Sequence, residues 1–291
     1  MNPGCPNLKC KYHQSNEVIK RNGTYFRAND SRYVQRFKCT SCRRHFSFAT
    51  FSLAKGQKKR RVNVEVEKLL SASVSMRRIA RILNIHELTV KRKLEYLAKK
   101  AKLSQEKLLL KLRQNPIHHM QFDDLITIEH TKLKPIAVTV AVDVRQRTIL
   151  GAQVSRIPAF GHLAEISRRK YGYCKSNYEQ NARALFRKIK DSVHPNALIE
   201  TDEHQMYPKF VREFFPKTTH ETFKSERGSV AGQGELKKVQ YDPLFAINHT
   251  LAMMRANINR LVRRTWCTTK DPKMLQLHLD LFVNYYNQNL I

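Results

Sequence analysis

From residue 117 onward, short apolar runs alternate with amphipathic segments, and the order of these segments constrains the fold more than any other feature of the chain. The run over 135–143 is apolar almost throughout, which predicts a central strand. The expected order is strands over 118–128, 135–143 and 148–154, a helix over 179–192, a strand over 197–201, a helix over 207–215, a strand near 218–222 and a helix from residue 244. This order predicts a domain over 116–291 with a mixed sheet.

Two isolated carboxylates each end an apolar run of this region. Asp123 closes His-Met-Gln-Phe-Asp, and Asp202 closes Ala-Leu-Ile-Glu-Thr-Asp. Mg²⁺ prefers hard oxygen ligands, and two such ions can activate a nucleophile and stabilise a leaving oxygen at one phosphorus. Asp124 points to the opposite side of a strand from Asp123, so only one of them can face the metal ions. We expect Asp123 to do so, with Asp124 as the alternative.

The charge of the chain indicates a polyanionic partner. The formal net charge is +30, and residues up to Gln114 carry 28 Lys and Arg against 7 Asp and Glu. The rest of the chain carries 26 against 17. DNA or RNA is therefore the expected partner of the N-terminal half. An anionic membrane is a weaker candidate, because no stretch approaches the roughly 18 apolar residues of a spanning helix.

Four of the six cysteines form two closely spaced pairs within residues 1–50. Cys5 and Cys10 are separated by four residues, and Cys39 and Cys42 by two. Short strand-like segments surround the pairs, so the pattern predicts a zinc ribbon with one tetrahedral Zn²⁺ site. Either of two histidines could replace one ligand: His13 or His45. The polar N-terminus and the metal-ligand pattern of the cysteines predict a cytoplasmic protein.

Residues 51–115 have the pattern of a basic linker, a helix-turn-helix and a connector helix. Ser75 is a candidate N-cap for a helix over 76–83, Asn84-Ile85 is the expected turn, and a second helix should follow over 87–97. A separate amphipathic helix is expected over 99–113. An ordinary basic helical hairpin would have a similar pattern. In a helix-turn-helix, the face that enters the major groove would carry Thr89, Lys91, Arg92 and Lys93.

The chain, over about residues 5–285, resembles the Asp-Asp-Glu-type transposases of prokaryotic insertion sequences that begin with a zinc ribbon and a helix-turn-helix. The resemblance is carried by Gln121-Phe-Asp-Asp124, Ser155-Arg-Ile-Pro-Ala-Phe-Gly161, Thr201-Asp-Glu-His-Gln-Met-Tyr207, Asn248-His-Thr-Leu-Ala-Met-Met-Arg255 and Arg260-Leu-Val-Arg-Arg-Thr-Trp-Cys-Thr-Thr-Lys270. It implies a multidomain α+β protein whose catalytic domain is ribonuclease-H-like, with acids on the first and fourth strands and a third residue on the last helix. It also implies metal-dependent transposition on double-stranded DNA, at terminal inverted repeats and target sites.

The third position of the family motif departs from the usual pattern, because Asn248 stands where the family usually has Glu. The resemblance implies a triad of Asp123, Asp202 and Asn248 that binds Mg²⁺ or Mn²⁺. Glu235 and Asp242 are the alternatives for the third ligand. Seven residues advance a helix by about two turns, so Asn248 and Arg255 should share a face. Arg255 could then bind a phosphate of DNA, and Arg260, Arg263 and Arg264 are expected to continue a basic helix.

The expected activity is strand cleavage followed by transfer of the new 3′-hydroxyl into target DNA, and a homo-oligomer is expected because two ends must be joined in concert. A nucleoid-associated location follows from such an activity. A DNA-binding regulator derived from a transposase is the alternative, and the neutral Asn248 favours it. A nuclease without strand transfer is a third candidate.

Overall fold

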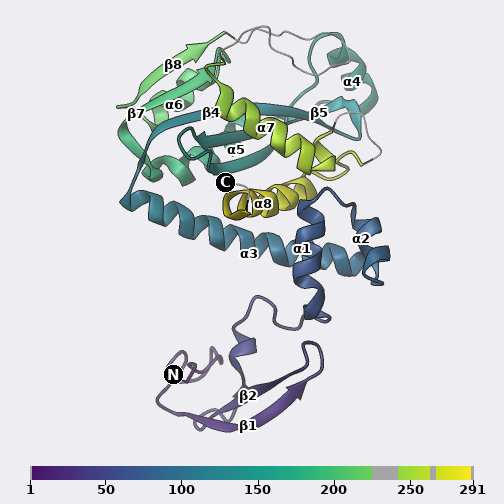
Figure 1. Ribbon diagram of the computed structural model, residues 1–291, viewed down its shortest axis with the longest axis vertical. Coiled ribbons are helices and arrows are strands. Elements are labelled where there is room, and N and C mark those ends of the chain that lie inside the picture. The colour runs from purple at the N-terminus through teal and green to yellow at the C-terminus, as the bar shows by residue number, and fades with distance from the viewer. Residues whose placement is uncertain (1, 225–241, 263–266, 290–291) are drawn as a thin grey trace.

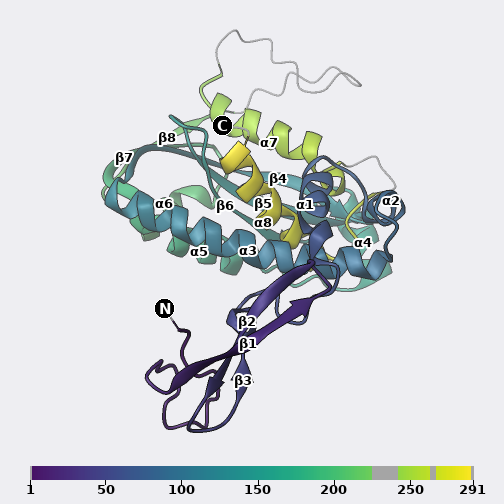
Figure 2. The same ribbon diagram turned by 60° about the horizontal axis from the view of Figure 1, so that its bottom comes forward.

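The computed structural model describes residues 2–224, 242–262 and 267–289. This part of the chain is a mixed α+β protein with eight α-helices, a three-stranded sheet and a five-stranded sheet. Figures 1 and 2 both show the small sheet set apart from the large one, with helices α1 to α3 between them. No helix among the described residues combines the length and the apolar character that crossing a membrane requires.

The small N-terminal sheet is antiparallel and consists of β1 (Ile19–Arg27), β2 (Arg32–Cys39) and β3 (His45–Phe46). Its core is small. Ile19, Phe37 and Phe46 are buried beside the cysteines, and the rings of Phe37 and Phe46 lie 6.0 Å apart. So few apolar side chains bury little surface, which is typical of small units that a bound metal ion completes.

Three helices follow: α1 (Asn63–Ser71), α2 (Met76–Ile82) and α3 (Glu87–Gln114). Ser75 is the N-cap of α2, as predicted, and its hydroxyl accepts a hydrogen bond from the Arg78 amide. The turn before α3 contains Asn84 at a φ of 47°, a conformation that Asn tolerates better than most residues. Two separate helices were expected over 87–97 and 99–113, and this prediction is wrong. The segment is one helix, because neither Gly nor Pro interrupts it.

The large sheet has the strand order β6-β5-β4-β7-β8. The first three strands in the chain pair antiparallel, whereas β7 pairs parallel to β4 and β8 parallel to β7. The strand bounds are β4 (Ile117–Glu129), β5 (Thr131–Asp143), β6 (Ile149–Arg156), β7 (Val193–Asp202) and β8 (Thr219–Phe223). β5 is central to the apolar core, with every residue from Pro135 to Asp143 buried. The predicted order of strands is confirmed.

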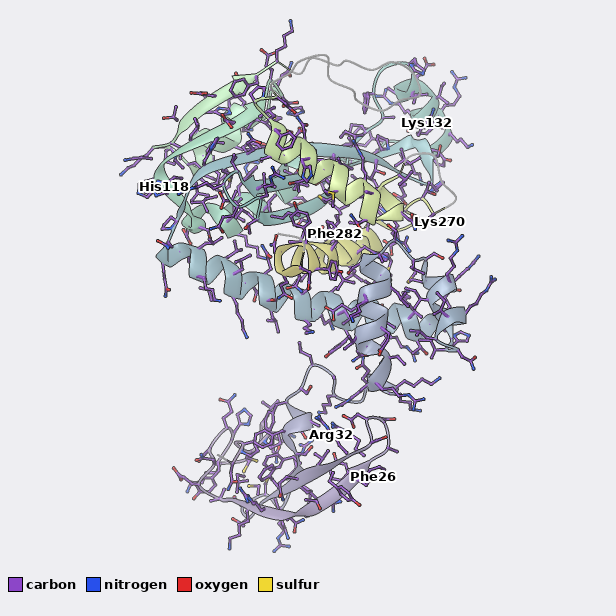
Figure 3. The ribbon with its side chains drawn as sticks, viewed as in Figure 1. Phe26, Arg32, His118, Lys132, Lys270 and Phe282 are labelled. Atoms are coloured by element: carbon purple, nitrogen blue, oxygen red, sulfur yellow. The ribbon has the colours of Figure 1, made fainter. Side chains whose placement is uncertain are left out.

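Helices cover both faces of the large sheet. Figure 1 shows α7 across the front of the sheet and α5 behind it. One buried cluster joins Leu125 to residues of α7 and α8, including Phe282, which is labelled in Figure 3. A second cluster joins Phe122 to residues of α5 and α6. The helices are α4 (Leu163–Tyr171), which was not predicted, and α5 (Tyr178–Ile189), α6 (Tyr207–Phe214), α7 (Phe245–Asn257) and α8 (Pro272–Asn289).

The long helix α3 connects the N-terminal helices to the large sheet. Near its start, Leu94 and Leu97 share a buried cluster with Leu281 of α8. Further along, Gln105 Nε2 donates to the carbonyl oxygens of Ile149 (3.0 Å) and Leu150. The domain boundary expected at residue 115 therefore falls at the end of a helix that packs on both of the units it was expected to separate.

Candidate active site

Asp123, in the middle of β4, and Asp202, the last residue of β7, lie just beyond the stretch over which these two parallel strands pair with each other. The pairing of β4 with β7 extends to Gln121 and Glu200, and each aspartate follows two residues later on its own strand. Residues two apart on a strand point to the same face. Gln121 contacts the start of α7, since its Oε1 accepts from the Ile247 amide at 3.0 Å. The two aspartates therefore lie side by side on the face that α7 covers.

The surroundings of Asp123 disfavour its ionised form. Partial burial raises the pKa of Asp123 to about 7, and the negative charge of Asp202 is the second cause. Two donors hold the Asp123 carboxylate in place: the Asp124 amide at 2.7 Å and the Tyr207 hydroxyl at 3.2 Å, both to Oδ1. Asp202 Oδ1 accepts from the His204 amide at 3.0 Å. Two carboxylates that repel each other on neighbouring strands are a donor set that suits a hard divalent cation.

Asp124 points to the other face of the sheet, among α5 and α6. Its Oδ1 accepts from the Thr139 hydroxyl at 2.5 Å, and its Oδ2 accepts from the Tyr178 hydroxyl. Burial raises the pKa of the Asp124 carboxyl as well. Asp124 is thus held by hydroxyl donors and does not face α7, so the geometry favours Asp123 over Asp124 as a partner of Asp202.

Asn248 lies in the first turn of α7, one residue after the anchored Ile247. Its Nδ2 donates to Asp242 Oδ2 at 2.9 Å, while Asp242 Oδ1 accepts from the Leu244 amide at 3.1 Å. Because a carboxylate only accepts, the amide nitrogen must face Asp242, and the amide oxygen is the atom that could bind a cation. Among the described residues, no hydrogen bond joins Asn248 to either aspartate. The alternative ligand Glu235 lies outside the described residues.

Four residues around this site were not assigned a role from the sequence: His119, Gln121, Glu200 and Tyr207. Glu200 Oε2 accepts from Gln121 Nε2 at 2.7 Å and contacts His119 Nε2 at 2.6 Å. Gln121 is 1% exposed and Glu200 8%. Two polar residues in otherwise apolar strands, each two positions before a candidate ligand, were the signal that could have identified them.

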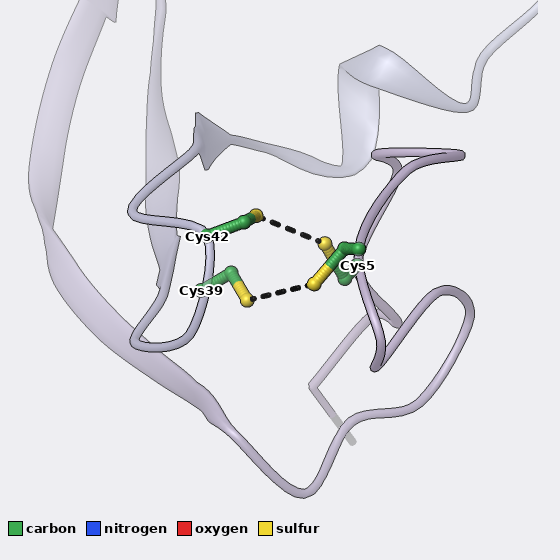
Figure 4. A group of neighbouring side chains, drawn as sticks. Cys5, Cys39 and Cys42 are labelled. Carbon is green, nitrogen blue, oxygen red and sulfur yellow. Dashed lines mark hydrogen bonds between the residues drawn. The ribbon is translucent and has the colours of Figure 1, made fainter.

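The four cysteines of the N-terminal sheet form one cluster. Their sulfur atoms lie within 4.8 Å of one another. Figure 4 shows the Cys5–Cys42 contact, at 3.6 Å, and the sulfur of Cys10 lies 3.9 Å from that of Cys39. Burial raises the pKa of the Cys5 thiol to about 12, whereas the Arg44 amide is the main cause that lowers the pKa of Cys42 to about 6. Four clustered thiols could hold a metal ion such as zinc. Among the candidate substitutes, His45 is hydrogen-bonded to Asn22 instead.

The predicted DNA-contacting residues of α3 are not equally accessible. Lys91 and Arg92 are exposed, and Thr89 is half-buried. The prediction that Lys93 lies on the exposed face is wrong, because its side chain is 1% exposed. Its Nζ donates to the carbonyl oxygens of Lys58 (2.8 Å) and Lys59 (2.9 Å) in the linker. Burial is the main cause that lowers the pKa of Lys93 to about 8.

The basic helix expected after Arg255 is not present as predicted. Arg255 lies in the last turn of α7, but the helix ends at Asn257. Arg260 belongs to a short 3₁₀ turn, and burial lowers the pKa of its guanidinium. The remaining predicted residues, Arg263 and Arg264, lie outside the described residues.

Neither the comparison with protein-family models nor that with curated proteins gave a match. The chemistry of the site therefore has to be argued from its own residues.

Proposed function

We propose that this chain is a DNA transposase that binds the ends of a mobile element, cleaves a strand and transfers the new 3′-hydroxyl into target DNA. The observation that carries the proposal is the pair of Asp123, in the middle of β4, and Asp202, at the end of β7, on neighbouring parallel strands and on the face covered by α7. The strand order β6-β5-β4-β7-β8, with three antiparallel strands followed by two parallel ones, supports a ribonuclease-H-like catalytic domain.

In this proposal Asp123, Asp202 and the amide oxygen of Asn248 hold Mg²⁺ or Mn²⁺. The metal ions supply an activated nucleophile and stabilise the leaving oxygen of the phosphodiester. Arg255, two helical turns after Asn248 in α7, would contact a phosphate of the bound end.

The N-terminal half supplies DNA binding in this proposal. Its excess of positive charge favours phosphate contacts, and α2 and α3 would act as a helix-turn-helix, with Lys91 and Arg92 exposed at the start of α3. The four-cysteine cluster would be a zinc ribbon that presents the basic strands β1 and β2. Two element ends must be joined together, so a homo-oligomer is part of the proposal.

Cleavage of authentic element ends tests the proposal. Purified protein is incubated with Mg²⁺ or Mn²⁺ and DNA that carries the inverted repeats flanking the coding region, and strand breaks are resolved on denaturing gels. Asp123→Ala and Asp202→Ala should abolish cleavage while end binding persists. Asp191→Ala, which removes a carboxylate that is paired with Arg113 just before the start of β7, at the opposite end of that strand from Asp202, is the matched control and should cleave normally. Equal cleavage of the element ends by all variants would contradict the proposal.

A DNA-binding regulator is the second candidate, favoured by one observation. Asn248 carries no charge, and its amide nitrogen is bound to Asp242. If the chain is a regulator, the wild-type protein will bind the element ends but leave them uncut with either metal ion. Asp123→Ala will then bind the ends as tightly as the wild type does.

A further inference from the structure

Gln121 belongs to one of the three elements that carry the candidate metal ligands, β4, and its side chain bonds to the other two, β7 and the start of α7. Its Nε2 donates to Glu200 Oε2 at 2.7 Å and to the Pro243 carbonyl oxygen at 2.8 Å. Its Oε1 accepts from the Ile247 amide at 3.0 Å. The side chain is 1% exposed, so water cannot replace these partners. A single buried amide thus uses both its donor and its acceptor atoms across β4, β7 and the start of α7.

Each partner of Gln121 is close in sequence to a candidate ligand. Asp123 follows Gln121 by two residues on β4, and Asp202 follows Glu200 by two residues on β7. Asn248 follows Ile247 directly in α7. Two residues along a strand are about 6.6 Å apart, so a shift in the amide network would move the ligands almost as far as it moves Gln121 itself.

The bonds of Gln121 also satisfy groups that an apolar side chain would leave without partners. Ile247 lies in the first turn of α7, where amide groups have no acceptor within the helix. The carboxylate of Glu200 is 8% exposed, and Gln121 is one of its two described side-chain partners, the other being His119. An apolar residue could fill the same space but could not fix the direction of α7 relative to the two strands.

We propose that Gln121 is a positioning residue, which sets the helix carrying Asn248 against the two strands carrying Asp123 and Asp202. The inference rests on the proposed function and deepens it. Gln121 does not touch the metal ions or DNA; it acts through the placement of the three ligands. Loss of a side chain that orients metal ligands typically weakens metal affinity by about 10–100-fold.

Two variants separate the hydrogen bonds from the space that Gln121 fills. Gln121→Met keeps the length of the side chain and removes all three bonds. The exchange Gln121→Glu with Glu200→Gln keeps the net charge, the carboxylate–amide bond between the strands and an acceptor for the Ile247 amide, and it removes only the donor to the Pro243 carbonyl oxygen. Gln153→Met, the same substitution in the half-buried part of β6, is the matched control.

The measurement is the Mn²⁺ dissociation constant, obtained by paramagnetic resonance of free Mn²⁺ without DNA, on zinc-loaded full-length protein. Thermal unfolding and binding of the element ends are measured beside it. Gln121→Met should weaken Mn²⁺ binding by about 10–100-fold, while the exchange variant and Gln153→Met should stay within about threefold of wild type. A residue with a purely structural role would lower the unfolding temperature and leave the affinity of the folded protein unchanged.

Wild-type Mn²⁺ affinity in folded Gln121→Met would overturn the inference and leave the proposed function intact. If Gln121→Met does not fold, the exchange variant decides: retained affinity would support the two bonds that it keeps, to residue 200 and to the Ile247 amide, and a tenfold loss of affinity would contradict the role assigned to these two bonds. Wild-type protein that neither binds Mn²⁺ through Asp123 and Asp202 nor cleaves DNA would overturn the proposed function together with the inference.

Discussion

The ionised Asp123 carboxylate destabilises the folded state whenever no cation balances its charge. Its pKa in the folded state is about 7, because of partial burial and the nearby charge of Asp202. An unfolded chain would ionise this group near pH 3.9. Between these two values the folded state keeps a proton that the unfolded state has lost, so stability falls as the pH rises from about 4 to about 7.

We therefore expect Asp123→Asn to raise the unfolding temperature at pH 8 without added divalent cations, and to leave it nearly unchanged at pH 4, where the aspartate is already neutral. Thermal unfolding followed by circular dichroism at the two pH values measures the difference. As a control, Mg²⁺ at pH 8 should stabilise the wild type more than the variant. An equal effect of the substitution at both pH values would show that Asp123 ionises normally.

The cysteine cluster makes a prediction that does not depend on DNA. Metal analysis of the purified protein should find about one zinc per chain, and Cys39→Ser should lose it, because structural zinc sites use four ligands. Cys174→Ser is the control: this thiol donates to the Ile157 carbonyl oxygen in another part of the molecule and should have no effect on zinc content. Full zinc content in Cys39→Ser would contradict a site made of the four cysteines.

The acids and the cysteines could be predicted from the sequence because their signals are local. Cysteine spacing and the ends of apolar runs are visible within a few residues of each site. The network around Gln121 could not be predicted in the same way, because its partners are 79 to 126 positions away along the chain. A buried glutamine is visible as a polar residue in an apolar strand, but its partners follow only from the packing of α7 on the sheet.

At the level of elements, Lys93 of α3 shows how a distant segment can change the role of a side chain. Helical periodicity places Lys91, Arg92 and Lys93 on or beside one exposed face, and for the first two this holds. The linker carbonyl groups of Lys58 and Lys59 come over the position of Lys93 and bury it. No local pattern encodes this contact, since it depends on how the linker returns to the helix.

Substitution of Lys93 should therefore affect the stability of the protein, and substitution of Lys91 should affect DNA binding. Lys93→Met removes two hydrogen bonds from a buried ammonium group to backbone carbonyls and should lower the free energy of unfolding by about 1–3 kcal/mol in urea titrations. Lys91→Ala should change that free energy by less than about 0.5 kcal/mol, but should reduce the salt dependence of DNA binding by about one unit of slope. Weaker DNA binding without loss of stability in Lys93→Met would contradict the burial.

The end of α7 is also decided by a distant contact. The Ser73 hydroxyl donates to the Ala256 carbonyl oxygen at 3.0 Å, and the Asn259 side-chain amide donates to the Ser73 carbonyl oxygen. The first bond satisfies a carbonyl group at the C-terminus of the helix, and the second ties the residues after the helix to the loop between α1 and α2. The sequence after Arg255 contains no Gly or Pro to stop a helix until well beyond this point, so the predicted helix was too long.

For the whole molecule, the element order followed from the sequence, but the joining of the N-terminal helices to α8 did not. Apolar periodicity shows that a helix has a buried face without showing which element covers it. Leu281 of α8 is buried in the cluster formed by α1, α2 and α3. The helical unit and the large sheet therefore share part of their core and should unfold together.

Leu281→Ala should destabilise both units by about 2–5 kcal/mol in one cooperative transition. Circular dichroism in the far ultraviolet and hydrogen exchange in β5 are expected to report the same midpoint. Leu103→Ala, at a position of α3 that is 46% exposed, is the control and should change little. Separate midpoints for the helices and the sheet would contradict a shared core.

The unbroken course of α3 has a consequence for how such a protein would measure distance along DNA. A helix of 28 residues is a stiff rod of about 42 Å, with Lys91 and Arg92 near one end and Leu109 fixed in the core of the large sheet near the other. In the proposed transposase, the absence of a hinge between these ends would keep a constant separation between the base pairs bound by the start of α3 and the large sheet that carries the candidate metal ligands. The number of nucleotides between the recognised base pairs and the cleavage site would then be set by the length of α3.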